Sequence, residues 1–404
     1  MTPAEADLPP IISVDDHIIE PRDLWVRELP PSMRDRGPHV VRERIRLDFK
    51  GGRLLLERDA PDGKWCDLWC FEDLVTPTML LHAAAGIDAD HGADVPAVYE
   101  DFRPAAYDPA ERLRDMDTNH VEASICYPNT FPRFAGQGFA ERKDLDLGLA
   151  SLELYNDWMI DVWCGGAGRG RLIPLTLVPL WDADLAAAEV RRCASKGSYA
   201  IAFTENPAKL GFPSLHSGKW DPLWEACTET GTVVSMHIGS SSSMPTTSDD
   251  APLAVSMSLN AQNAQGSVCD WVFSRTLERF PTIKLAYAES QAGWMPFLFE
   301  RMDGVWHEGV GGVDLPQPPS SYAKGRIYGC IFDDEHALRS RDEIGLDRLL
   351  FESDYPHANG TWPNTRAVAH RLCDAAGMSA EECALLLRRN AIDCYGLERW
   401  GIAA

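Results

Sequence analysis

Eight short apolar runs recur along the 404-residue chain, and each is followed, directly or after an insertion, by a segment with the apolar periodicity of a helix. This alternation predicts parallel strands joined by helical crossovers, and eight repeats predict a (β/α)8 TIM barrel. The apolar runs cover residues 11–14, 123–127, 172–178, 200–203, 232–238, 283–288, 327–332 and 349–352. The helical patterns cover residues 108–118, 148–164, 182–195, 220–230, 265–280, 294–306, 334–344 and 364–376. No linker or repeat divides the chain, so we expect residues 1–404 to form one barrel domain.

Residues 30–107 do not fit this alternation, and they lie between the first strand and its helix. Residues 45–49 and 54–57 have the pattern of two strands, and the Lys-Gly-Gly-Arg sequence between them predicts a β-hairpin. An aromatic-rich stretch follows at residues 65–71. We expect an inserted β-hairpin and aromatic subdomain that caps the barrel mouth above the substrate. A subunit contact is the alternative use of the same segment.

The composition narrows the range of partners. The chain has 61 acidic and 38 basic residues and a formal net charge of −23, without a basic cluster that could follow a nucleic-acid backbone. No apolar run reaches the length of about 18 residues that spans a membrane, and the acidic, proline-rich N-terminus does not resemble a signal peptide. The 11 cysteines are odd in number and irregularly spaced, which favours reduced thiols. We therefore expect a cytoplasmic enzyme with a small-molecule substrate, bound to neither nucleic acid nor membrane.

Polar residues follow several of the apolar runs directly. Asp15 and His17 follow the first run, His237 lies near the end of the fifth, and Asp354 follows the eighth. In a barrel the active site lies at the carboxyl ends of the strands, and residues two apart in an extended segment point the same way. These four side chains can therefore converge on the barrel axis. Their two imidazoles and two carboxylates suit Zn, Fe or Mn with a position left open for water.

The sequence also contains a series of longer motifs. In order they are IISVDDHIIEPRDLW, MDTNHVEASICYPN, YNDWMIDVW, RLIPLTLVPL, WDPLWEACTETG, MHIGSSS, LAYAESQAGWMPFLFERMD, LLFESDYPH and RNAIDCYGL. With these motifs, which span nearly the whole chain, the sequence resembles the amidohydrolase-related family, in the branch of metal-dependent decarboxylases and hydrolases of small acids. The resemblance implies a (β/α)8 barrel with Asp15, His17, His237 and Asp354 at the positions of the metal ligands. It also suggests a homo-oligomer, a dimer or larger.

One position departs from the family pattern. Members of this family usually carry a histidine after the sixth strand, and here Glu289 stands at that place. A carboxylate is a weaker base near neutral pH unless burial raises its pKa, whereas a neighbouring divalent cation favours its ionised form. Glu289 therefore has three possible roles: a general base, a structural acceptor, or a ligand to a second metal.

Further potential ligands lie nearby in the sequence. His357 follows Asp354 by three residues, and Glu20 follows His17 by three. Two or more imidazoles with several carboxylates are the composition expected of a carboxylate-bridged pair of iron or manganese ions. The sequence is similar, in its ESxxGW and SDYPH motifs, to a subgroup of this fold that holds two irons and hydroxylates organic substrates with dioxygen.

Two residues after the second strand are candidates for substrate binding. Arg133 stands between Phe131 and Phe134 and could pair with a substrate carboxylate, or it could form a surface ion pair. Asn129 could hydrogen-bond the substrate, or it could satisfy the loop backbone. The run of residues 239–243 could bind an anion through its backbone N–H groups and hydroxyls, or form a flexible loop.

Three hypotheses for function follow. We expect, first, a non-haem diiron monooxygenase with an external reductant, since no dinucleotide-binding fingerprint is present; its ligands would be Asp15, His17, His237, Glu289, Asp354 and His357. The alternative is a decarboxylase or hydrolase of a small organic acid with one Zn or Mn ion, in which Glu289 moves a proton. The third hypothesis is a barrel without activity that stabilises an active homologue.

Overall fold

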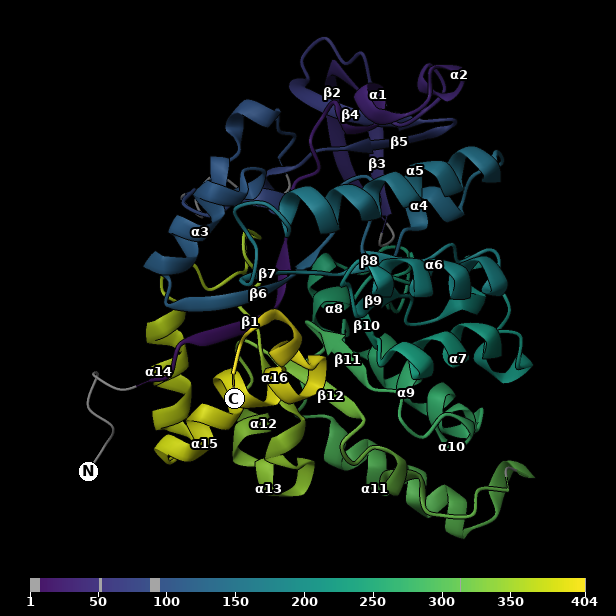
Figure 1. Cartoon of the computed structure of the whole chain (residues 1–404), viewed down its shortest axis with the longest axis vertical. Coiled ribbons are helices and arrows are strands. Elements are labelled where there is room, and N and C mark those ends of the chain that lie inside the picture. The colour runs from purple at the N-terminus through teal and green to yellow at the C-terminus, as the bar shows by residue number, and fades with distance from the viewer. Residues whose placement is uncertain (1–7, 51–52, 88–94, 313, 404) are drawn as a thin grey trace.

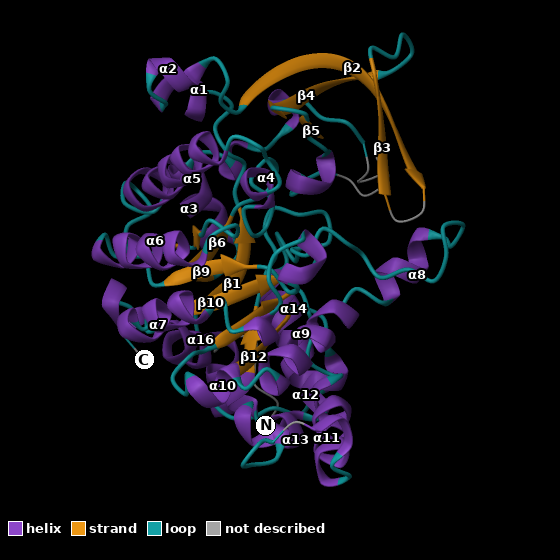
Figure 2. Ribbon diagram, turned by 90° about the vertical axis from the view of Figure 1, so that its right-hand side faces the viewer, coloured by secondary structure: helices purple, strands orange, loops and turns teal. Residues whose placement is uncertain are grey.

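The computed structural model describes residues 8–50, 53–87, 95–312 and 314–403, and a parallel barrel lies at its centre (Figures 1 and 2). The barrel strands are β1 (Ile11–His17), β6 (Val121–Tyr127), β7 (Leu172–Pro174), β8 (Thr176–Leu177), β9 (Ala200–Phe203), β10 (Val233–His237), β11 (Leu285–Ala288), β12 (Ile327–Ile331) and β13 (Leu349–Phe351). β7 and β8 lie within one predicted run and are separated only by Leu175. Each of the eight apolar runs therefore forms a barrel strand, which confirms the predicted (β/α)8 fold.

The strand order is β1-β6-β7 and then β8-β9-β10-β11-β12-β13, with all pairs parallel. The barrel closes between its first and last strands. Asp354 N donates to Asp15 O at 3.0 Å, and His17 N donates to Tyr355 O at 2.6 Å. This closure places the segment after β13 directly beside the segment that ends β1.

Helices cover the outside of the barrel (Figure 2). They are α3 (Pro109–Thr118), α4 (Gln137–Ala140), α5 (Leu145–Trp158), α6 (Ala183–Ser195), α7 (Asp221–Thr230), α9 (Gln262–Phe273), α10 (Thr276–Arg279), α11 (Met295–His307), α12 (Glu335–Arg339), α13 (Arg341–Ile344), α14 (Thr365–Ala375), α15 (Ala380–Ala384) and α16 (Asn390–Tyr395). The short helix α8 (Leu253–Ser258) projects away from the barrel (Figure 2). The helical pattern at 265–280 forms two helices rather than one, because Arg275 has a left-handed backbone (φ 62°) between α9 and α10. No helix in the described part of the chain is long and apolar enough to cross a membrane.

The segment between β1 and α3 forms a separate antiparallel sheet (Figure 2). Two short helices, α1 (Leu24–Glu28) and α2 (Pro31–Arg34), precede it, and its strands in the order β3-β2-β4-β5 are β3 (Arg53–Arg58), β2 (His39–Lys50), β4 (Lys64–Phe71) and β5 (Leu74–Pro77). β2 and β3 pair as the predicted hairpin, whose Gly-Gly turn lies outside the described residues.

Aromatic rings join this sheet to the barrel. Trp69 of β4 packs edge-on against Trp25 of α1, with 5.2 Å between ring centroids, and Phe131 of the loop after β6 contacts both rings. The Trp25 indole also donates to Ser151 O of α5 at 2.9 Å. All three rings are fully buried, whereas Trp65 is 53% exposed. Part of the predicted aromatic stretch thus packs at the interface between the inserted sheet and the barrel.

Residues that follow the sheet reach the closure of the barrel. Ala85 N donates to Pro356 O at 3.0 Å, and Ala358 N donates to Leu81 O at 3.3 Å. The inserted segment is therefore bonded through its backbone to the loop that begins with Asp354.

The side chain of Asp16 stabilises the closure of the barrel through hydrogen bonds. It is buried and accepts hydrogen bonds from the hydroxyls of Ser13, Ser124 and Ser353 and from Tyr355 N, at 2.6–3.0 Å. These donors lie on β1, on β6 and in the loop after β13. Asp16 therefore ties three strands together on the face opposite to Asp15 and His17.

We expect Asp16→Ala to lower the free energy of unfolding by about 3 kcal/mol, because it leaves several buried donors without an acceptor. Urea denaturation followed by circular dichroism measures this loss. Asp342→Ala, at an exposed aspartate of α13, should change stability by less than about 0.5 kcal/mol. An Asp16→Ala loss as small as that of the control would contradict the role of Asp16 in closure.

Candidate metal centre

The carboxyl ends of four barrel strands bring six of the predicted site residues together. Asp15 and His17 lie on β1 and His237 ends β10, while Glu289 follows β11. Asp354 and His357 lie in the loop after β13. All six are buried. The cluster therefore lies where the active site of a (β/α)8 barrel is expected.

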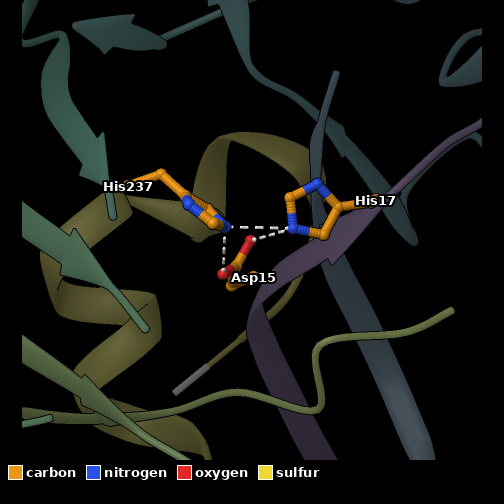
Figure 3. A group of neighbouring side chains, drawn as sticks. All are labelled: Asp15, His17 and His237. Carbon is orange, nitrogen blue, oxygen red and sulfur yellow. Dashed lines mark hydrogen bonds and ion pairs between the residues drawn. The ribbon is translucent and has the colours of Figure 1, made fainter. Parts of the chain in front are cut away.

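Asp15 bridges two imidazoles (Figure 3). Its Oδ1 lies 3.3 Å from His17 Nε2, and its Oδ2 lies 3.3 Å from His237 Nε2. The two Nε2 atoms are themselves only 3.1 Å apart. The three side chains thus direct their ligand atoms toward a common point between them, as Figure 3 shows.

Asp354 extends the cluster on the side of β13. Its Oδ1 lies 3.5 Å from His17 Nε2 and 2.8 Å from His357 Nδ1, while Glu289 Oε2 lies 3.6 Å from His237 Nε2. Within the described residues, three overlapping groups have ligand atoms within 4.8 Å of one another: Asp15, His17 and His237; His17, Asp354 and His357; and Asp15, Glu289 and Asp354.

Apart from the imidazoles of the cluster, no hydrogen-bond donor in the described part of the chain reaches the carboxylates of the two aspartates. All four carboxylate oxygens of Asp15 and Asp354 are buried without a hydrogen-bond partner. Burial raises the pKa of Asp15 to about 6, against the pull of His237, and burial together with Glu289 and Asp15 raises the pKa of Asp354 well above its usual range. Buried carboxylates without donors need a compensating positive charge. The residues present therefore fit a divalent cation.

The imidazoles are held in the tautomer that metal binding requires. His17 Nδ1 donates to Pro128 O at 3.1 Å, and His237 Nδ1 donates to Ile238 O at 2.7 Å. Nε2 of each ring is thereby directed at the cluster, as in other sites where a backbone carbonyl orients a ligating histidine. Burial lowers the pKa of His237, but Asp15 and Glu289 outweigh it and raise the pKa to about 9. In the absence of a cation, a proton on His237 thus balances these carboxylates.

Asn129 orients His357. Its Nδ2 donates to His82 O at 2.9 Å, which fixes Oδ1 as the acceptor for His357 Nε2 at 3.4 Å. His357 Nδ1 is then left to face Asp354. Since both polar atoms of the Asn129 amide are engaged by the protein, this geometry favours a positioning role over the substrate contact that we expected.

Arg133 lies outside the cluster. Its backbone is left-handed (φ 56°), and its guanidinium lies 3.7 Å from Glu141, as in the alternative of a surface ion pair. The two rings that flank it in sequence separate: Phe131 joins the aromatic contact with Trp69, whereas Phe134 stacks on His237 with 3.9 Å between centroids. Phe134, which we named from the sequence only as a neighbour of Arg133, therefore covers the ring of His237.

Glu20 also lies outside the cluster, contrary to the suggestion that it approaches the cavity. Its carboxylate accepts from Asn129 N at 2.8 Å, from Thr130 N at 3.2 Å and from the Thr130 hydroxyl at 2.5 Å. Glu20 thus stabilises the loop after β6 and is saturated by it.

Two of the site carboxylates have strained backbones. Glu289 (φ 55°) and Asp354 (φ 52°) are left-handed, a conformation that costs a non-glycine residue about 1 kcal/mol or more. Glu352, absent from our sequence-based set, supports the first of them, because its carboxylate accepts from Glu289 N at 3.1 and 3.2 Å. The fold therefore holds both carboxylates in positions that the local chain does not favour.

The amidohydrolase family model matches residues 74–397, and the chain belongs to this family. No curated protein matches the chain. Among solved structures, it is similar to an amidohydrolase from Mycobacterium avium subsp. paratuberculosis K-10, with 20% identity over 97% of this chain and 100% of that one and a TM-score of 0.69.

Two further structural relatives are decarboxylases. One is 5-carboxyvanillate decarboxylase from Novosphingobium aromaticivorans, complexed with manganese and 4-hydroxy-3-methoxy-5-nitrobenzoic acid; it shares 15% identity over 96% of each chain, with a TM-score of 0.61. The other is 2,6-dihydroxybenzoate decarboxylase from Rhizobium, with 14% identity over 96% of this chain and 99% of that one and a TM-score of 0.61. These likenesses show the same fold.

We expect Mn²⁺ binding to release protons and to strengthen as the pH rises from 5 to 7. The reason is that the metal-free site holds protons on His237 and on carboxyls with raised pKa values, and a cation displaces them. Isothermal titration in buffers of different ionisation enthalpy measures the number of protons released. Binding that is independent of pH, with no proton release at pH 6, would contradict this account of the site.

Proposed function

We propose that this chain is a metal-dependent decarboxylase of a small organic acid. The observation that carries the proposal is the convergence of Asp15, His17, His237 and Asp354, in which both carboxylates lack hydrogen-bond donors. Two structural relatives are described as decarboxylases of aromatic acids, which favours this function over the oxygenation that we expected from the sequence.

The four converging residues would hold one divalent ion. When bound, the ion supplies a Lewis acid that orients and polarises an anionic substrate group. His17 and His237 offer their Nε2 atoms to it, and their Nδ1 atoms stay bonded to backbone carbonyls. Phe134, stacked on His237, excludes water from this side. We propose that the segment at residues 30–107 caps the barrel mouth, since its backbone is bonded to the loop of Asp354.

Glu289 is the residue that we propose moves the proton. Decarboxylation breaks the bond between the substrate carbon and its carboxyl group, the electron pair stays on that carbon, and a proton must replace the departing CO2. Glu289 lies at the edge of the cluster, with Oε2 3.6 Å from His237 and Oε1 accepting from Asn359 Nδ2 at 3.3 Å. Its place in the sequence is that of the family's usual histidine, and from this edge of the cluster we infer that it carries a proton to the substrate carbon.

A second candidate function is the diiron oxygenation expected from the sequence. The observation that favours it is the presence of two further ligand groups, which add Asp354, His357 and Glu289 to the first group and bring the donors to six. Glu289 would then be a ligand, and reducing equivalents would come from an external partner. Metal stoichiometry separates the two candidates.

For the decarboxylase, elemental analysis of protein produced with iron, manganese and zinc available should give about one Mn or Zn per chain. The same protein should release CO2 from a hydroxybenzoate, with 2,6-dihydroxybenzoate and 5-carboxyvanillate as first tests. Two irons per chain, with dioxygen consumption and no CO2 release, would contradict the proposal and support oxygenation.

Glu289→Gln should lower kcat about 10²-fold or more with the metal content unchanged, because it removes the proton carrier and keeps the side-chain shape. Glu225→Gln, at an exposed residue of α7, should change neither quantity. Loss of about half of the bound metal from Glu289→Gln would instead make Glu289 a ligand in a dinuclear centre.

A further inference from the structure

Glu205 is a buried carboxyl group that the proposed mechanism does not use. It follows β9 and is 1% exposed. Phe203 of β9 pairs with Met236, and Ala288 of β11 pairs with His237. Glu205 follows β9 by two residues and Glu289 follows β11 directly, so the two residues come from the strands on either side of β10. Glu205 therefore flanks the strand end that carries His237.

Neither oxygen of its carboxyl group has a hydrogen-bond partner among the described residues, although the backbone N–H of Gly239 favours its ionised form. Of the buried carboxyl groups that the structure describes, those of Asp15, Asp354 and Glu205 alone have both oxygens without a hydrogen-bond donor. The two aspartates have nearby imidazoles and belong to the metal groups, but Glu205 belongs to none of these groups. Burial raises the pKa of Glu205 to about 8, against the pull of His237 and Lys209. A partner from outside the chain would relieve this cost.

The neighbouring loop gives this side of the centre its polar character. Glu205 N donates to Ser240 Oγ at 2.9 Å, which ties the residue to the loop at 239–243. Asn263 Nδ2 supports the same loop through Ser243 O at 2.8 Å, and the Ser243 hydroxyl is itself buried without a partner. The β9–β10 side thus holds two polar side chains, those of Glu205 and Ser243, whose buried atoms have no hydrogen-bond partner.

We propose that Glu205 determines specificity by hydrogen-bonding a hydroxyl group of the organic acid bound at the metal centre. This inference rests on the proposed function and names a substrate class, a hydroxy acid. A hydroxyl both donates and accepts, so it can satisfy both atoms of a carboxyl group. An ammonium group fits less well, because the cation and the Lys209 ammonium already make this region positive. A site built to bond a hydroxyl discriminates strongly against the analogue that lacks it.

The test compares the binding of benzoate with that of 2-, 3- and 4-hydroxybenzoate to the Mn-loaded protein by isothermal titration. At least one hydroxybenzoate should bind about tenfold or more tightly than benzoate. In Glu205→Leu this ratio should fall to about one, with benzoate affinity and metal content unchanged. The melting temperature of the unliganded variant should stay the same or rise, because an unpaired buried carboxyl group is removed.

Glu189→Leu is the matched control. Glu189 is equally buried but bonded to Asn156 and Arg192, so its loss should lower the melting temperature and leave the binding ratio intact. An unchanged ratio in Glu205→Leu, or loss of metal from it, would overturn the role of Glu205 alone. If none of the four acids binds the wild-type protein in a metal-dependent way, the proposed function fails, and this inference fails with it.

Discussion

Two carboxylates without hydrogen-bond donors, those of Asp15 and Asp354, are the constraint on which the site depends. Such groups are costly to bury, and the closure of the barrel forces them together, since Asp354 N donates to Asp15 O. The same backbone contact that completes the fold therefore creates a concentration of negative charge. A cation at the carboxyl ends of the strands would compensate for this charge, so the contact that closes the barrel also builds the proposed metal centre.

The surroundings of these carboxylates keep the ligands in place. Backbone carbonyls orient His17 and His237, and Asn129 orients His357. Asp16, one residue from two ligands but on the opposite face, bonds donors on three strands. These side chains then need little rearrangement when a metal ion binds, and such a preorganised site can position a substrate precisely.

Much of this arrangement could be predicted from the sequence, because strands and the polar residues directly after them leave a local pattern. The eight apolar runs and the convergence of Asp15, His17, His237 and Asp354 follow from that pattern and from the rule for strand ends. Loop positions could not be predicted in this way: the left-handed backbone at Arg133 and the tertiary bonds of Asn129 have no local signature. Glu205 does have a local signature, because it closely follows the fourth apolar run. The rule that polar residues after a strand lie near the active site would have identified it.

The central claim is that a divalent ion binds among Asp15, His17, His237 and Asp354. Anomalous diffraction from crystals of the Mn-loaded protein, recorded above and below the manganese absorption edge, tests it most directly. The account predicts a strong peak within coordination distance of ligand atoms from these four residues. The absence of a peak at this site, with manganese bound elsewhere in the molecule, would contradict it.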